Sequence, residues 1–199
     1  MPEPLPVHEG VTDLRELVAN ARNGDEAAIG ELYDRYFVRV FRFVYARTGN
    51  THDAEDIAGE AFLKVVRSIQ SFSWQKGGEG GFEPWLFRIV RNEVVNHLRR
   101  NPGNRQGVDL TEAGNIEGRD DIDRSELRLM VQEATKHLPE AQREIVALRF
   151  AGDLESRQIA EILGKSEANI RVLQFKALKN LQKILAEQFA YQPSIEAVN

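Results

Sequence analysis

Residues 154–179 have the sequence LESRQIAEILGKSEANIRVLQFKALK, and this pattern predicts a helix-turn-helix. Ser156 is the expected N-cap of the first helix, because its hydroxyl can accept a hydrogen bond from an unpaired backbone N–H. Gly164 stands where that helix must end, in a position that favours a positive φ. Ser166 is the expected cap of the second helix. The apolar residues of the first helix fall on one face: Ile159, Ala160 and Leu163.

The second predicted helix has an apolar side, with Ile170 and Leu173, and a polar, basic side. In helix-turn-helix proteins the corresponding helix contacts bases and phosphates in the major groove. The residues expected to face outward are Arg171, Gln174, Lys176 and Lys179. The alternative is an ordinary helical hairpin with a solvated basic face.

The composition limits the classes of protein that fit this chain. Its 199 residues suit one large or two small domains, and the lack of cysteine excludes disulfides and thiolate metal sites. No apolar run approaches the length of a membrane span and no signal peptide is apparent, so we expect a cytoplasmic protein without membrane insertion. The net charge of −5 hides segregated charges, since residues 82–100 and 165–183 are basic while 1–34 and 109–126 are acidic.

Caps and helical spacing predict an all-α fold. It consists of two small helical domains joined by a flexible acidic linker, and the second domain contains the helix-turn-helix. Asp53 is the expected cap of a helix that reaches residue 70, and Phe150 is expected to be buried by the helix that Pro139 begins. The expected segments are a lead with a short helix at 1–24, a first domain at 25–100, a linker at 101–121, a second domain at 122–189 and a disordered tail at 190–199.

Residues 82–100 form the second informative stretch, a predicted helix with an arginine and asparagine stripe. A loop with four glycines, residues 71–81, precedes it and lacks the features of a nucleotide-binding P-loop. Cations that hold phosphates, amides that contact base edges and aromatic rings that stack on bases together fit single-stranded nucleic acid. The alternative is a solvated polar face. The stripe and its margin comprise Trp85, Arg88, Arg91, Asn92, Asn96 and Arg99.

No combination of side chains suggests catalysis. The four histidines are scattered and cysteine is absent, so the sequence offers no nucleophile–base pair and no metal cluster with plausible spacing. We therefore expect a protein that is not an enzyme and that needs neither a metal nor a cofactor.

Several linked motifs resemble the bacterial RNA polymerase sigma factors of the extracytoplasmic-function type, in the sigma-70 family. The resemblance covers about residues 27–100 and 125–183. The motifs in the first domain are LYDRY at 32–36, DAEDI at 53–57, EAFLK at 60–64, FEPWLFRIVRN at 82–92 and HLRR at 97–100. Those in the second are LPEAQRE at 138–144, QIAEILG at 158–164, NIR at 169–171 and KAL at 176–178.

The resemblance implies that the chain gives core RNA polymerase its promoter specificity. Core polymerase would bind Asp53, Asp56, Glu60 and Lys64. The −10 element would be opened and held by Phe72, Trp74, Trp85, Arg88, Arg91, Asn92, Asn96 and Arg99, with the loop at 71–81 capturing a flipped base. The −35 element would be contacted as duplex by Ser166, Asn169, Arg171, Val172, Phe175, Lys176 and Lys179. Core RNA polymerase, promoter DNA and an anti-sigma factor are the implied partners.

Some residues depart from the family pattern. The loop is longer and richer in glycine, Gly59 replaces the usual glutamine, and Val172 and Leu173 stand where many members have serine and arginine. The alternatives are a helix-turn-helix regulator that is no polymerase subunit and a helical adaptor whose basic faces bind protein. The segregated charge also suggests that the acidic linker and N-terminal segment compete with DNA for the basic helices.

Overall fold

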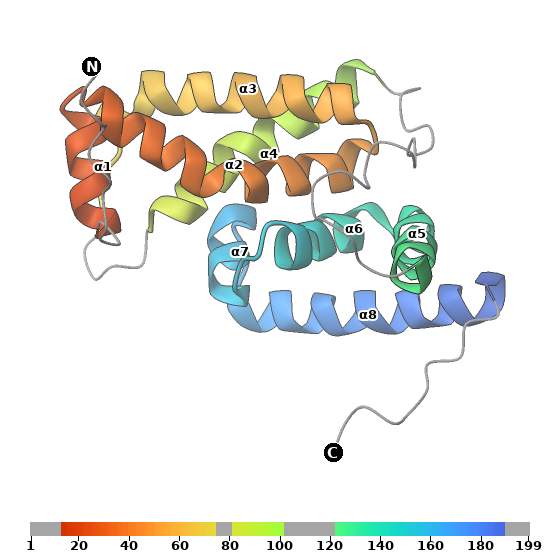
Figure 1. Ribbon diagram of the computed structural model, residues 1–199. Helices are drawn as coiled ribbons and strands as arrows, with labels where there is room; N and C mark the ends of the chain where they lie inside the picture. The colour runs from red at the N-terminus through yellow and green to blue at the C-terminus, as the bar shows by residue number, and fades with distance from the viewer. Residues whose placement is uncertain (1–12, 75–80, 102–121, 190–199) are drawn as a thin grey trace.

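The computed structural model describes residues 13–74, 81–101 and 122–189, and the regular secondary structure in these ranges is helical (Figure 1). This confirms the all-α prediction. Residues 1–12 of the expected lead, most of the linker and the tail lie outside the described residues, and the short helix expected in the lead is present as α1. The elements are α1 Leu14–Arg22, α2 Glu26–Thr48, α3 Thr51–Ser68, a 3₁₀ turn η1 Ile69–Ser71, α4 Phe82–Arg100, α5 Ile122–Lys136, α6 Glu140–Val146, a π-helical turn η3 Ala147–Ala151, α7 Ser156–Leu163 and α8 Glu167–Phe189.

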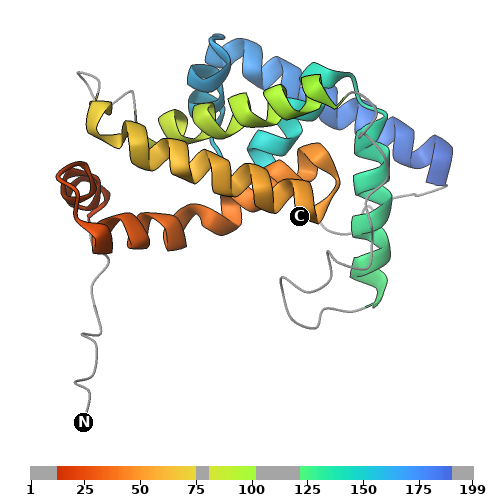
Figure 2. The ribbon, with the colours of Figure 1, turned by 90° about the horizontal axis from the view of Figure 1, so that it is seen from above.

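Helices α2, α3 and α4 form the core of the first domain, and α1 packs across the start of α2 (Figures 1 and 2). The spacing that predicted α2 gives it a buried stripe, and α4 closes the core with Phe82 and Phe87. Tyr36 lies in this core with its ring 5.5 Å from that of Phe82. Burial, followed by the charge of Glu83, raises the pKa of Tyr36 to about 12, so the phenol stays neutral.

Side chains and a glycine cap the helices of the first domain, and the predicted cap Asp53 is wrong. Asp13 and Asp25 cap α1 and α2, and Gly49 ends α2 with a φ of 73°. Asp53 does not begin α3, however. Asn50 is its N-cap, and the side-chain oxygen of Asn50 accepts the backbone N–H of Asp53 at 2.8 Å. Asp53 is thus the third residue of α3, where its negative charge still favours the positive end of the helix dipole.

The Asp25→Ala substitution tests the capping argument. The Asp25 carboxylate accepts the backbone N–H groups of Ala27 and Ala28 at 2.9 and 3.2 Å. We expect its loss to lower the free energy of unfolding by about 1 kcal/mol, measured by urea denaturation. The Asp34→Ala substitution on the exposed face of α2 removes the same charge and should change stability by less than half as much.

The second domain is built on α8, against which α5, α6 and α7 pack. Gly164 ends α7 with a φ of 63° and the Ser166 hydroxyl accepts the N–H of Asn169 at 3.3 Å, so both predictions are confirmed. The prediction for Ser156 is wrong. Glu155 is the N-cap of α7 and donates its backbone N–H to the Gln158 side chain at 2.8 Å. Ser156 instead donates to the side chain of Gln174 at 2.9 Å.

Two side chains in the second domain point differently from the expectation. Phe150 is 64% exposed rather than buried, because the π-helical turn widens the helix and shifts the residues of η3 around its axis. Gln174, which was expected to face outward, is half-buried and accepts the hydroxyl of Ser156 on α7. Gln174 therefore ties α8 to α7.

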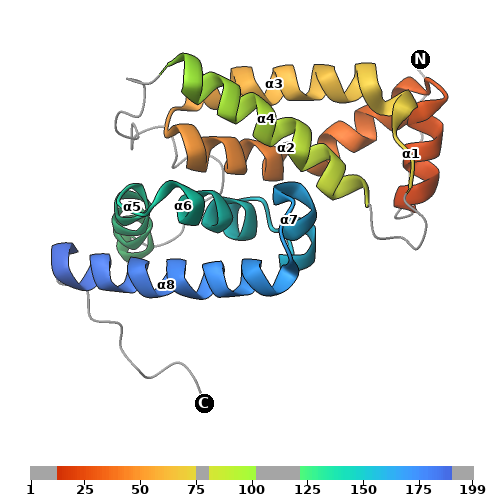
Figure 3. The ribbon, with the colours of Figure 1, turned by 180° about the vertical axis from the view of Figure 1, so that it is seen from behind.

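The two domains pack against each other in this structure (Figure 3). Helix α2 contacts η3, and α4 contacts α7, so that buried residues of both domains form one continuous apolar cluster. Gly152 lies at the closest approach. A Cβ atom added there would come 3.0 Å from the Phe87 ring and 2.8 Å from the carbonyl oxygen of Leu148.

Candidate nucleic-acid interface

Helix α8 presents the predicted −35 residues on its outer surface. Its inner side is fixed by Ile170 and Ala177, which are fully buried. Phe175 is 69% exposed and Val172 is 52% exposed, although both are apolar. All seven residues of the predicted set are exposed: Ser166, Asn169, Arg171, Val172, Phe175, Lys176 and Lys179. The face thus combines cations with apolar groups, as contacts to phosphates and thymine methyls require.

Helix α4 carries the predicted −10 residues on two sides of its surface. Asn92 and Arg99 are exposed. Asn96 is half-buried and turns toward α3, where it lines a hollow of about 210 Å³ with Asp56 and Glu60. Arg88 and Arg91, nearer the start of α4, contact the second domain instead.

A polar hollow of about 150 Å³ lies where the loop after η1 meets α4. Its lining residues are Ser71, Phe72, Ser73, Gly81, Pro84, Trp85, Arg88 and Glu161. Hydroxyl groups, an indole edge and a guanidinium are groups that can hold an unpaired base. The loop at 71–81 was expected to capture a flipped base, and its residues 75–80 lie outside the described residues.

The prediction that Phe72 stacks on DNA does not fit the structure. Its ring is 3% exposed and packs against Trp85 and Phe82, with centroids 5.1 and 5.6 Å away. Phe72 therefore supports the floor of the hollow. Trp74 is half-buried against Phe72, and the guanidinium of Arg15 lies 5.0 Å from its ring centroid. Trp85 keeps a partly exposed edge at the hollow.

The residues predicted to bind core polymerase lie along α3. Asp56 and Glu60 are exposed. Asp53 and Lys64 are tied to α4: His97 lies 3.4 Å from the carboxylate of Asp53, and Lys64 pairs with Glu93 at 2.6 Å. These two pairs link α3 to α4.

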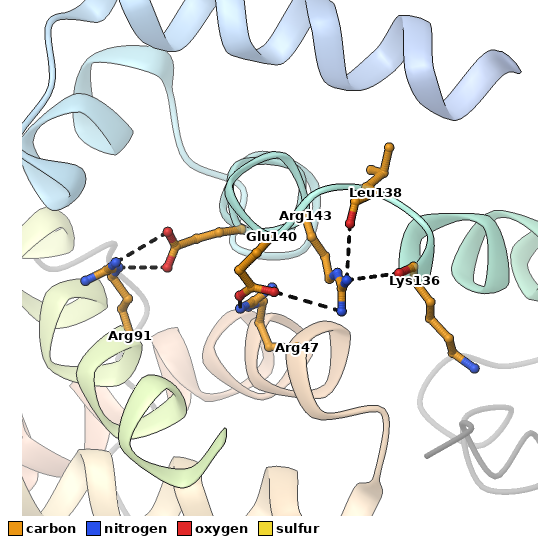
Figure 4. A network of polar contacts seen from close by, with 7 residues as sticks. Arg47, Arg91, Lys136, Leu138, Glu140 and Arg143 are labelled. Carbon is orange, nitrogen blue, oxygen red and sulfur yellow. Dashed lines mark hydrogen bonds and ion pairs between the residues drawn. The ribbon is translucent and has the colours of Figure 1, made fainter. Parts of the chain in front are cut away.

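A network of polar contacts joins the domains (Figure 4). The guanidinium of Arg91 on α4 binds the carboxylate of Glu144 on α6 through two contacts, at 2.8 and 3.4 Å. Arg47 of α2, buried from solvent, pairs with Glu140 at the start of α6. Arg88 donates to the backbone carbonyl of Glu161 on α7 at 2.9 Å.

Arg39 and Glu83 extend this network, and sequence analysis missed both. Arg39 pairs with Glu83 at 2.5 Å and donates to the carbonyl oxygens of Gly152 and Asp153 at distances of 2.9–3.1 Å. Glu83 also accepts from the side chain of Gln158 at 2.6 Å. Their partners in the second domain lie 75 or more positions away in the sequence, so no local pattern could have predicted these contacts.

The described residues show neither a cluster of metal-ligating side chains nor a membrane-spanning helix. Among them, no group of three or more histidine, cysteine, aspartate or glutamate side chains could hold a metal ion. In the same part of the chain, the helices are too short or too polar to cross a membrane.

Comparison with known proteins identifies both domains. Residues 32–102 match the family model of sigma-70 region 2, and residues 128–181 match that of sigma-70 region 4. The sigma-E factor of Escherichia coli K12, an extracytoplasmic-function (ECF) RNA polymerase sigma factor, is 32% identical over 183 residues, which cover 85% of this chain and 92% of that protein. The chain belongs to the ECF sigma factors of the sigma-70 family. As such it directs RNA polymerase to promoters, and the regulator alternative is not favoured.

Another relative agrees with this assignment, and two solved structures share the fold. The ECF sigma factor BldN of Streptomyces coelicolor is 32% identical over 182 residues, and the match covers 87% of this chain and 66% of BldN. The structure of CnrH in complex with the cytosolic domain of CnrY aligns with a TM-score of 0.67 at 21% identity, covering 87% of this chain and 97% of CnrH. The sigma factor RpoE of Bartonella quintana, in complex with the anti-sigma factor NepR, aligns with a TM-score of 0.56 at 20% identity, covering 79% and 98%. These two structures support the fold of the sigma factor.

Proposed function

We propose that this sigma factor divides promoter recognition between its two domains. The α3 face binds core RNA polymerase, the α4 face and the adjoining hollow open and hold the −10 element, and the outer face of α8 contacts the −35 element as duplex. The division of exposed residues carries the proposal: α8 exposes cations and apolar groups suited to the major groove, whereas the hollow beside Trp85 and Arg88 is suited to an unpaired base.

In this proposal the sigma factor performs no catalysis itself. Unpaired bases gain stacking and hydrogen-bonding partners on α4 that duplex DNA cannot offer, so binding energy favours the open promoter. The protein acts in the cytoplasm with core polymerase. An anti-sigma factor is a further proposed partner, since the related RpoE of Bartonella quintana was solved in complex with one.

In vitro transcription with core polymerase and a promoter library tests the proposal. Adding the protein should produce specific starts downstream of paired −35 and −10 elements. If it retards duplex DNA but yields no specific starts, the proposed division of labour is wrong and a regulator function gains support.

The Lys176→Ala substitution tests the −35 face. Lys176 is exposed on α8, and we expect its ammonium group to bind a phosphate. We expect holoenzyme binding to weaken about equally for all −35 sequences, and the slope of log K against log salt to fall by about one. The control is Lys183→Ala, farther along α8, where the ammonium group lies 3.7 Å from Glu187. An equal effect of both substitutions would indicate a general charge effect.

A further inference from the structure

Helix α1 contacts the start of the loop that leads to the polar hollow. It packs across the start of α2 and also against η1 (Figure 1). Its inner side is buried through Leu17, Val18 and Ala21. Residues 14–22 lie outside the stretch that matches sigma-70 region 2, residues 32–102, so the family match assigns no role to α1.

A series of ring contacts leads from α1 to the hollow. The guanidinium of Arg15 lies 5.0 Å from the ring centroid of Trp74, within the range of a cation–π interaction. The ring of Trp74 lies 5.1 Å from that of Phe72 and is nearly perpendicular to it, at 78°. Phe72 is buried, and its ring centroid is also 5.1 Å from that of Trp85. Since Phe72 and Trp85 line the hollow, Arg15 is linked to it through other side chains.

The position of Arg15 within its helix does not favour a cation. Asp13 is the N-cap of α1, so Arg15 is the second residue of the helix. The positive end of the helix dipole repels a cation in the first turn. The Arg15 residue is also exposed, so it adds little to the apolar core. The stability of α1 therefore does not account for an arginine at this position, whereas the contact with Trp74 does.

We propose that Arg15 is a positioning residue for the −10 hollow. Its guanidinium holds the Trp74 ring against Phe72, and Phe72 in turn fixes the Trp85 ring at the hollow, where an unpaired base stacks. Trp74, which was predicted to contact the −10 element, then acts as the support between α1 and the hollow. The proposal rests on the proposed function of the hollow. An exposed cation–π contact corresponds to a factor of about two to five in an equilibrium constant, and we expect an effect of this size.

The Arg15→Gln substitution removes the cation and keeps a side chain that suits a helix. The measurement is the Kd of the holoenzyme for a single-stranded oligonucleotide that carries the −10 nontemplate strand of a promoter active in the library. We expect Arg15→Gln to raise this Kd about two- to fivefold. Arg15→Lys keeps a cation near the Trp74 ring and should stay close to the wild type.

The matched control is Arg22→Gln, which removes the same charge from the same helix. The Arg22 guanidinium lies 3.5 Å from the backbone carbonyl of Gln70, and Gln70 is not among the residues that line the hollow. We therefore expect this variant to bind the oligonucleotide as the wild type does. An equal rise in Kd for Arg15→Gln and Arg22→Gln would show a general charge effect and overturn the proposal, as would an unchanged Kd for Arg15→Gln.

Abasic substitutions separate an effect on the hollow from a general effect. Each −10 base is replaced in turn by an abasic site, and the base that the hollow holds is the one whose removal abolishes the effect of Trp85→Ala. Arg15→Gln should bind that abasic oligonucleotide as tightly as the wild type does, and should bind the others more weakly. An equal loss on all of them would overturn the role of Arg15 and leave the hollow as the base site. If no abasic site abolishes the effect of Trp85→Ala, the proposed function of the hollow is itself wrong.

A double-mutant cycle tests for a direct contact between Arg15 and the DNA backbone. If Arg15 acts through Trp74, Arg15→Gln should add little to the effect of Trp74→Leu, so the two losses are not additive. An arginine that bound a phosphate would instead cost the same in both backgrounds and would lower the salt slope by about one. That result would overturn the proposal. Because Arg15 is exposed, its variants keep the core intact, and the abasic comparison holds even if Trp74→Leu folds poorly.

Discussion

The Phe87→Ala substitution is expected to lower the free energy of unfolding by about 3–5 kcal/mol, the largest effect on stability that we predict. Phe87 is fully buried, and its ring contacts that of Phe43 edge-on, with centroids 5.9 Å apart. The guanidinium of Arg39 lies 5.6 Å from its ring centroid. Truncation would leave a cavity beneath the contact between the two domains. Urea denaturation followed by circular dichroism gives the free energy.

Phe87→Leu is the matched control for this prediction, because it keeps most of the apolar volume and should cost clearly less than alanine. Phe150→Ala provides a second comparison. Phe150 was expected in the core from its spacing, but its ring is 64% exposed, so its removal should change stability by less than 1 kcal/mol. Similar losses for Phe87→Ala and Phe150→Ala would contradict the packing described above.

The individual helices could be predicted because their signals are local. The carboxylates of Asp13 and Asp25 and the positive φ of Gly49 and Gly164 act within one turn of the residues they cap. The error at Asp53 has the same origin. Asn50 lies three residues earlier, and its side-chain oxygen accepts a backbone N–H of the first turn, as the Asp53 carboxylate was expected to do. Only the path of the turn decides which of the two side chains becomes the cap.

The contact between the domains could not be predicted in this way. Glu144 and Arg91 each belong to a helix whose polar face appears solvated when that helix is considered alone, and 53 positions separate them. The π-helical turn at η3 had no sequence signal either, and it moved Phe150 out of the core. Most residues predicted to face DNA lie at the surface, but the contacts of Arg88 and Arg91 with the second domain were not predicted.

Trp85→Ala is expected to reduce open promoter complexes by about 5- to 150-fold while closed-complex binding changes little. The estimate follows from the 1–3 kcal/mol lost per stacked base when an aromatic ring is replaced by alanine. Trp85 is half-buried, and it lines the polar hollow with Ser73 and Arg88. Its ring is thus available to a base that has left the stack. Permanganate footprinting measures opening, and mobility shift of holoenzyme on duplex DNA measures closed binding.

Trp85 also packs on Phe72 and Phe82, with ring centroids 5.1 and 5.6 Å away. Its replacement by alanine therefore removes packing in the first domain as well as a ring that can stack on a base. Two further substitutions separate these causes. Trp85→Phe keeps an aromatic ring and should retain most of the opening activity. Asn92→Ala removes an exposed amide on the same helix and should impair opening without lowering stability. If Trp85→Ala lowers closed binding and opening equally, the hollow is a structural feature, and the opening of the −10 element must depend on other residues of the sigma factor.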